Sequence, residues 1–400
     1  MRHRLYFSPG MFGFGRLGSY DYFTHLERAL VARIRAGGDE ADTYVVQVAP
    51  TASIRRRAVK LAELVASTCD SGGDTDGPIH LIGHSTGGLD ARLVASPTIA
   101  LDVPPEALAW RHRLASITTL NAPHFGTPLA TFFTTMSGKR VLRAMTALTV
   151  VALSAGSPPL SAVGALVAAF GRMDHALGFD LKVLDRTTEA LLRGIDGVMS
   201  KEVRDYVDAI KQDNGAMVQL MPEAMDLFIA GVEDRPDVLC QCVATMAPRP
   251  SSGTFLRSLM APWSALSGGL FTILYKITSR FDECYPCAGS EEDKTTEGML
   301  ASAFGDAPGK DANDGVVPVR SQLWGQLVWT GHADHLDVLG HFQATQAARS
   351  EAVTEAGEPE PPNVDWLCSG SRFDEEKFAA LTDAVARGLL SSSRTMKRAS

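Results

Sequence analysis

The chain has 400 residues, of which 45% are apolar and 21% are charged, and its formal net charge is −8. This is the composition of a globular protein with a large core, and the length suits one enlarged α/β domain as well as two domains. The acidic balance leaves no broad basic face, which argues against nucleic acid as a partner. The basic residues at 391–400 are expected to form a disordered tail.

Short apolar, β-rich runs recur along the chain and alternate with helical patterns. Strands are expected at 5–7, 44–48, 79–82, 117–120 and 238–244. Helices are expected at 53–67 and from residue 89 onward. This alternation predicts an α/β fold with a mostly parallel central sheet and helices on both faces, in which ligands bind at the carboxyl ends of the strands.

Two segments have some features of targeting or membrane sequences. Residues 5–18 are too rich in glycine for a secretory leader and contain no small-residue cleavage site, so the default compartment is the cytoplasm, with secretion left open. Residues 144–171 carry no charge, but a Gly-Ser-Pro-Pro turn at 156–159 divides them into halves shorter than the about 20 residues that span a bilayer. Two apolar helices joined by a turn are expected there.

The regular alternation stops at about residue 132 and resumes near residue 238. Between these points the sequence shows helical patterns and no clear strand. The organisation expected is therefore a single domain over 1–400 with an inserted helical region at 132–236.

One serine lies between a strand and a helix and is flanked by glycines. Ser85 occupies the centre of Gly-His-Ser-Thr-Gly, with Gly83 two residues before it and Gly87 two residues after it. A chain that turns from strand to helix at one residue strains that residue, and glycines at these positions remove the side chains that would collide. The spacing therefore predicts a nucleophile elbow at Ser85.

A serine hydroxyl needs a base and a group that orients the base, and in this fold class the order is serine, acid, histidine. The turn containing Asp314 is a candidate for the acid. His332, His335 and His341 all follow it, and spacing alone leaves the choice among them open.

Five pieces of the chain, in order, resemble the bacterial triacylglycerol lipases of the Pseudomonas and Burkholderia type, which belong to the α/β-hydrolase superfamily. The pieces are "SPGMFGFGRLGSYDYF" at 8–23, "LIGHSTGG" at 81–88, "NAPHFGT" at 121–127, "ANDGVV" at 312–317 and "DHLD" at 334–337. They bracket nearly the whole chain, although the insertion and the C-terminal tail match weakly.

The resemblance implies the role of each catalytic group. Ser85 corresponds to the nucleophile, Asp314 to the acid and His335 to the base, and the backbone N–H groups of Met11 and Thr86 correspond to the oxyanion hole. The chain departs from the family at Pro9, where a histidine usually precedes the loop glycine. A main-chain donor at Met11 survives this change, but the side-chain support of the loop does not.

Three residues outside the triad are expected to have supporting roles. His84 is expected to pack in the elbow, His124 to support a loop near the site, and Asp90 to interact favourably with the dipole of the helix after Ser85. His332 and His341 are expected to lie at the surface or behind the site.

The resemblance also implies a structural calcium ion, although the chemistry itself requires no cofactor. Asp337 fits one family ligand and Asp293 a second carboxylate, but His341 stands where a further oxygen ligand is expected. The alternative is that Asp337 caps a helix or forms a salt bridge. A zinc site is a separate hypothesis, with ordinary thiols or a disulfide as its alternatives; its four cysteines would be Cys240, Cys242, Cys284 and Cys287.

These features together predict a serine carboxylester hydrolase, and most specifically a triacylglycerol lipase. The uncharged helices of 144–171 would form a lid that contacts a lipid surface transiently, or a cap that only shapes an acyl pocket. The alternatives are a soluble esterase or acyltransferase with the same triad, and a non-catalytic module that binds lipid or membrane. The oligomeric state is left open.

Overall fold

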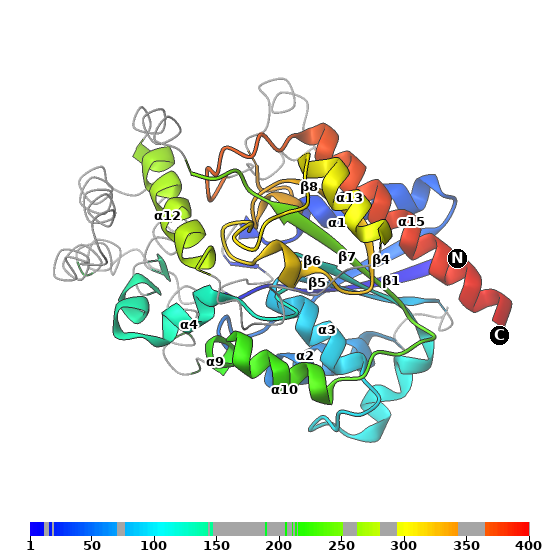
Figure 1. Cartoon of the computed structure of the whole chain (residues 1–400). Helices are drawn as coiled ribbons and strands as arrows, with labels where there is room; N and C mark the ends of the chain where they lie inside the picture. Colours follow the sequence, from blue (N-terminus) through cyan, green and yellow to red (C-terminus); the bar gives the residue numbers. More distant parts are fainter. Residues whose placement is uncertain are drawn as a thin grey trace.

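The centre of the protein is a sheet of six strands, all of them parallel. The computed structural model describes residues 1–11, 16–17, 20–69, 77–142, 145–146, 189, 205, 210, 213, 215–250, 262–280, 294–342 and 365–399. The strands are β1 (Arg2–Ser8), β4 (Glu40–Val45), β5 (Ile79–His84), β6 (Leu114–Leu120), β7 (Leu239–Met246) and β8 (Gln326–His332). Their order is β4-β1-β5-β6-β7-β8 (Figure 1), which confirms the predicted parallel sheet.

Helices cover both faces of this sheet because side chains alternate along each strand. On β1, Tyr6 points into a core shared with α2 (Ile54–Cys69) and α3 (Thr86–Ala95). Its neighbours Leu5 and Phe7 point into the opposite core, shared with α1 (Thr24–Ala36) and α15 (Glu375–Ala399). A further helix, α13 (Lys294–Phe304), packs against β8.

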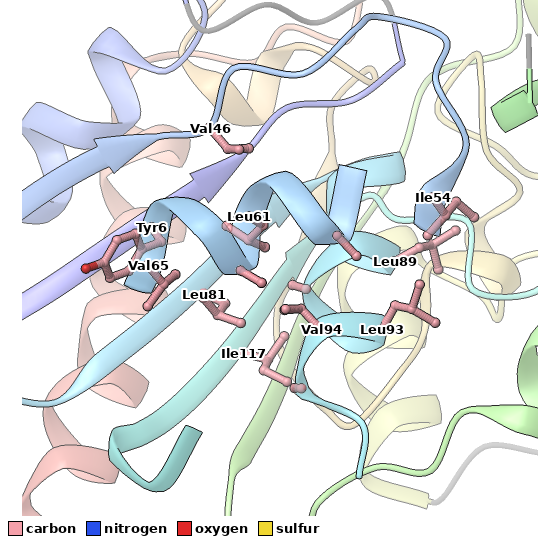
Figure 2. Close-up of a cluster of buried hydrophobic side chains, with 14 of the residues drawn as sticks. Tyr6, Val46, Ile54, Leu61, Val65, Leu81, Leu89, Leu93, Val94 and Ile117 are labelled. Atoms are coloured by element: carbon pink, nitrogen blue, oxygen red, sulfur yellow. The ribbon is translucent and has the colours of Figure 1, made fainter. Parts of the chain in front are cut away.

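The core between the sheet and the pair α2 and α3 shows why 53–67 forms a helix. Its buried residues recur at helical spacing, so that one face of α2 is apolar. Figure 2 shows Leu61 and Val65 of this face near Leu81 of β5 and Val94 of α3. Burying one such side chain contributes about 1.5–3 kcal/mol, which fixes both helices on the sheet.

The chain order places two loops side by side at one edge of the sheet. β1 pairs with β4 on one side and with β5 on the other, and Ser8 at its end lies opposite Gly83. The loops that follow β1 and β5 therefore leave the sheet next to each other, at the point where the strand order reverses. Ligands bind in such crevices in open α/β sheets.

Helices beyond the carboxyl ends of the strands enclose this edge. α4 (Pro128–Thr134) and α12 (Pro262–Thr278) pack against each other there (Figure 1). α9 (Gly215–Gln219) and α10 (Pro222–Gly231) follow the undescribed part of the insertion. The described residues of 132–236 contain helices and no strand, and most of the 144–171 segment lies outside them.

Several elements differ from the sequence-based expectations. The strand expected at 44–48 is β4, which spans 40–45. The strand β8 and the helix α12 were not predicted. Short 3₁₀ helices occur at Pro105–Arg113, Val319–Gln322 and Asp337–Leu339, and a two-stranded ribbon joins β2 (Arg16–Leu17) to β3 (Tyr20–Asp21). In the part of the chain that the structure describes, no helix is both long and apolar enough to cross a bilayer.

The C-terminal segment also differs: a disordered tail was expected at 391–400, but α15 continues to Ala399. The reason is that this segment still has an inward face. Ser393 is 2% exposed, and its hydroxyl lies 3.2 Å from Nε2 of His80 on β5. A helix held by such a contact on the sheet does not fray at residue 391.

Candidate active site

Ser85 lies in the sharp turn between β5 and α3, with φ 53° and ψ −126°. The two flanking glycines make this turn sterically feasible. A Cβ on Gly83 would lie 2.2 Å from the carbonyl oxygen of Gly87, and a Cβ on Gly87 would lie 2.0 Å from the carbonyl oxygen of Ser8. The elbow therefore needs glycine at both positions, and it holds Ser85 at the start of a helix.

A buried imidazole–carboxylate pair lies on two loops, with Asp314 after α13 and His335 after β8. Nδ1 of His335 lies 2.7 Å from Oδ2 of Asp314. Oδ1 of the same carboxylate accepts the backbone N–H groups of Val316 and Val317, at 2.8 and 2.7 Å. Because the carboxylate only accepts, Nδ1 carries the proton, and Nε2 is left as the basic nitrogen of the ring.

The geometry distinguishes the three late histidines that the spacing left open. His332 places Nδ1 3.2 Å from the main-chain oxygen of Met246, and His341 places Nε2 3.1 Å from that of Tyr22. Both His335 and His341 line a pocket together with Ser85, but His335 is the one of the three whose ring contacts Asp314. Burial lowers the pKa of His341 to about 3, so that ring stays neutral.

One apolar pocket joins Ser85 and His335. Met11 and Thr86 also line it. Its walls come from α4 and α12, through Leu129, Phe133, Leu270 and Leu274. Such a cavity, mainly apolar with a few polar groups, suits a ligand with a hydrophobic chain and one polar centre.

The loop after β1 lies directly over the serine. A Cβ on Gly10 would lie 2.8 Å from Cβ of Ser85, so only a glycine allows this approach. The next residue is Met11, one predicted oxyanion donor. The other is Thr86, the first residue of α3, whose N–H has no partner within the helix by position. The predicted donors thus come from the two segments that meet at the nucleophile, the loop after β1 and the start of α3.

A buried ion pair holds the start of this loop. Nε and Nη2 of Arg57 lie 2.9 and 2.8 Å from Oδ2 of Asp90, and both side chains are fully buried. Arg57 Nη2 also donates to the carbonyl oxygen of Pro9, and the Ser8 hydroxyl donates to Asp90 at 2.7 Å. Asp90 therefore does more than interact with a helix dipole, and the support that Pro9 lacks is supplied from α2.

Burial and the ion pair act on the pKa of Asp90 in opposite directions. Burial raises its pKa, and the Arg57 guanidinium opposes that rise. The sequence offered a signal for Arg57 that was missed. It lies between Ile54 and Leu61 on the apolar face of α2, where a charged residue must have a buried partner.

Asp337, one predicted calcium ligand, is hydrogen-bonded within the protein. Oδ2 of Asp337 accepts the N–H of Asp334 and the hydroxyl of Ser371, at 2.8 and 2.7 Å. These bonds tie Asp337 to the preceding loop and to Ser371, and they do not match the capping interpretation, because the 3₁₀ helix Asp337–Leu339 has no side-chain cap hydrogen bond. Within the described ranges, no group of three or more His, Cys, Asp or Glu side chains is arranged to hold a metal ion. Asp293 lies outside the described residues, so the calcium ion stays a prediction.

The zinc hypothesis rests on cysteines of which only two are described. Burial raises the pKa of Cys240 to about 12, which disfavours the thiolate that zinc binds. Cys242 is buried in the core beside α13. Cys284 and Cys287 lie outside the described residues, so zinc stays an untested prediction.

His124 supports the loop after β6 near the site, as expected. Its Nδ1 is 3.1 Å from Arg92, its Nε2 is 3.1 Å from the Thr119 hydroxyl, and its ring stacks on Trp324. Its backbone N–H donates to Ser321, which ties the loop after β6 to the segment that carries Asp314. Burial lowers the pKa of His124 well below its usual value, so its ring is neutral while it makes these contacts.

Comparison with known proteins gives structural relatives but no sequence relatives. No protein-family model matches the chain, and no curated protein matches it in sequence. A lipase from Staphylococcus hyicus is similar in structure, with a TM-score of 0.50 and 15% identity over 98% of this chain and 96% of that one.

Two further structures are similar at lower scores. EstA from Clostridium botulinum has a TM-score of 0.48 and 20% identity over 95% of this chain and 88% of that one. Lipase 1 from Pelosinus fermentans has a TM-score of 0.45 and 19% identity over 84% and 93%. The narrower resemblance to the Pseudomonas and Burkholderia lipases stays a prediction. The six-stranded parallel sheet and the likeness to the Staphylococcus hyicus structure show that the chain has the α/β-hydrolase fold.

Proposed function

We propose that the protein is a serine carboxylester hydrolase. The observation that carries this proposal is the convergence of Ser85, at a strained elbow, and the His335–Asp314 pair on one apolar pocket. These groups come from three separate loops. Their convergence supports a nucleophile, a base and an orienting acid more strongly than any single motif does.

The reaction follows from the proton positions. Nε2 of His335 takes the proton of the Ser85 hydroxyl as its oxygen attacks the ester carbonyl. The N–H groups of Met11 and Thr86 stabilise the oxyanion, and the imidazolium then gives its proton to the leaving alcohol. Water repeats the sequence on the acyl-enzyme. Asp314 keeps the proton on Nδ1 throughout and stabilises the imidazolium.

We propose further that the substrate is an acylglycerol with a long chain. The aliphatic and aromatic walls from α4 and α12 support an acyl-binding role. Met145 and Thr146, at the start of the uncharged 144–171 segment, also line the pocket. This supports the interpretation of that segment as a lid or cap next to the acyl chain.

The test is the rate of hydrolysis against substrate concentration, for an emulsified long-chain triacylglycerol and for a dissolved short-chain ester. Ser85→Ala is the blank. A lipase shows a jump in rate once the long-chain substrate passes its solubility limit. If the rate on the short ester saturates normally and the rate on the long-chain substrate does not rise at the interface, the protein is a soluble esterase with the same triad.

A further inference from the structure

A chain of hydrogen bonds connects the oxyanion loop to the loop that carries His335. The hydroxyl of Tyr22 lies 2.7 Å from Nδ1 of His84, and Nε2 of His84 lies 2.8 Å from the main-chain oxygen of His335. At the other end, the backbone of Gly10 hydrogen-bonds to the Tyr22 hydroxyl. A Cβ at Gly10 would lie 3.1 Å from that hydroxyl and 3.2 Å from the ring nitrogen.

The carbonyl at one end fixes the direction of every bond in this chain. A carbonyl oxygen only accepts, so Nε2 of His84 carries the proton and Nδ1 is the acceptor. Tyr22 must then donate its proton to Nδ1. Its oxygen is left to accept the N–H of Gly10, which is the backbone group there that can donate.

The burial of Tyr22 and His84 keeps the protons of both side chains in these positions. Tyr22 is 8% exposed and His84 is fully buried. Burial lowers the pKa of His84 well below its usual value, and the neighbouring His335 adds to this. Burial likewise raises the pKa of the Tyr22 hydroxyl. Neither group changes its protonation near neutral pH, so the chain has one proton arrangement.

We infer that Tyr22 and His84 are positioning residues that hold the oxyanion loop and the His335 loop at a fixed separation. This inference rests on the proposed function. Tyr22 anchors the amide of Gly10, one residue before the Met11 donor, and His84 anchors the main chain of the base. A donor must lie about 2.7–3.1 Å from the developing oxyanion to be effective, so a small shift of the loop weakens it.

The chain also explains how the site works with Pro9. Proline offers no side-chain donor, and the family histidine at this position is missing. Here Arg57 holds the carbonyl of Pro9 from one side, while Tyr22 holds the N–H of Gly10 from the other. The peptide between these residues is thereby fixed at both of its polar groups.

The experiment compares Tyr22→Phe with Tyr6→Phe in the full-length protein. Tyr6 on β1 is a matched control, because its side chain is also buried and its hydroxyl is also hydrogen-bonded, to Thr68 at 2.9 Å, but it lies in the core against α2. Each variant is assayed for kcat and KM on a soluble p-nitrophenyl ester and for inhibition by an arylboronic acid, which forms a tetrahedral adduct with the serine. The melting temperature of each is recorded.

We expect Tyr22→Phe to lower kcat on the order of tenfold, less than the loss of an oxyanion donor itself, with KM little changed. Its affinity for the boronic acid falls by a similar factor. Tyr6→Phe keeps both values even if its melting temperature falls. Wild-type kcat and boronic acid affinity in Tyr22→Phe, or equal losses in Tyr6→Phe, would overturn the inference.

A second pair of variants tests the other link. His84→Gln keeps an N–H near the position of Nε2 and so retains the donor to His335, whereas His84→Leu removes both bonds. We expect the glutamine variant to keep more of kcat than the leucine variant, and equal losses count against the inference. A wild-type protein without Ser85-dependent hydrolysis overturns the proposed function itself. An active wild type with an unaffected Tyr22→Phe overturns the positioning role alone.

Discussion

Gly87 faces the last carbonyl of β1 at a distance that leaves no room for a side chain. Together with Gly83 it lets the elbow, the sheet and the oxyanion loop pack against one another. Both glycines were predicted from their spacing around Ser85, because the steric demand of this turn is local in sequence. Tyr22 was not predicted as a support, because its partners Gly10 and His84 meet it only through the fold.

A methyl group at Gly87 is expected to displace the loop after β1. It would lie 2.0 Å from the Ser8 carbonyl oxygen, and that oxygen belongs to the backbone and cannot rotate away. Gly87→Ala should therefore destabilise the fold by about 1–3 kcal/mol, as overpacking does. It should also lower kcat at least about tenfold, because the shift reaches the oxyanion donors.

The control for this change is Gly298→Ala in α13. A Cβ at Gly298 meets no atom within 4 Å. Alanine there is expected to stabilise the helix by up to about 1 kcal/mol and to leave kcat unchanged. Urea unfolding and steady-state kinetics measure both effects. A Gly87→Ala protein with wild-type kcat would show that the loop does not depend on this contact.

At the scale of elements, α2 contributes to the site through one charged residue on its apolar face. Arg57 and Asp90 join α2 to α3 and hold the carbonyl of Pro9. A helical pattern predicts which face of α2 is buried, and it did so here. It does not show which carboxylate faces Arg57, because that depends on how two helices and a loop are placed on the sheet.

Removing one partner of this pair should cost far more stability than removing both. Asp90→Leu leaves a buried guanidinium without its carboxylate, and we expect a loss of about 3–5 kcal/mol. The double variant Arg57→Met with Asp90→Leu should recover most of that loss, since apolar side chains of similar volume replace the pair.

Activity in the same variants should not follow stability. The double variant lacks the donor to the Pro9 carbonyl, so its kcat should stay low although its fold is restored. Denaturant unfolding and ester hydrolysis on wild type, both single variants and the double variant make the comparison. Recovery of kcat together with stability in the double variant would contradict a role for Arg57 in holding the loop.

At the scale of the whole molecule, the sequence predicted the parallel sheet but not all of the elements that build it and the site. Alternating strand and helix patterns predicted the parallel sheet. Ser85 follows β5 and His335 follows β8, whereas Asp314 follows α13 in sequence. The fold brings the Asp314 turn to the end of β7, where the N–H of Ala247 donates to the carbonyl of Asn313. The strand β8 and the helix α12 were missed. β8 is a short run that continues into the histidine segment, and α12 follows residues with no clear pattern.

The C-terminal segment is another part of the structure that the sequence did not predict. Residues 391–399 look like a polar, basic tail in sequence, but they extend a helix whose inward residues lie on the sheet. Whether such a segment is ordered depends on the surface next to it, which composition does not describe. The pocket walls are a further case, since α4 and α12 are far apart in sequence and meet only beyond the sheet.

The central claim is that Ser85 is a nucleophile activated by His335. The most direct measurement is covalent labelling with a fluorophosphonate, followed by mapping of the modified peptide by mass spectrometry. The account predicts one modified residue, Ser85, with labelling lost in Ser85→Ala and strongly slowed in His335→Ala. A folded wild-type protein that stays unlabelled at Ser85 would contradict it and favour a non-catalytic module.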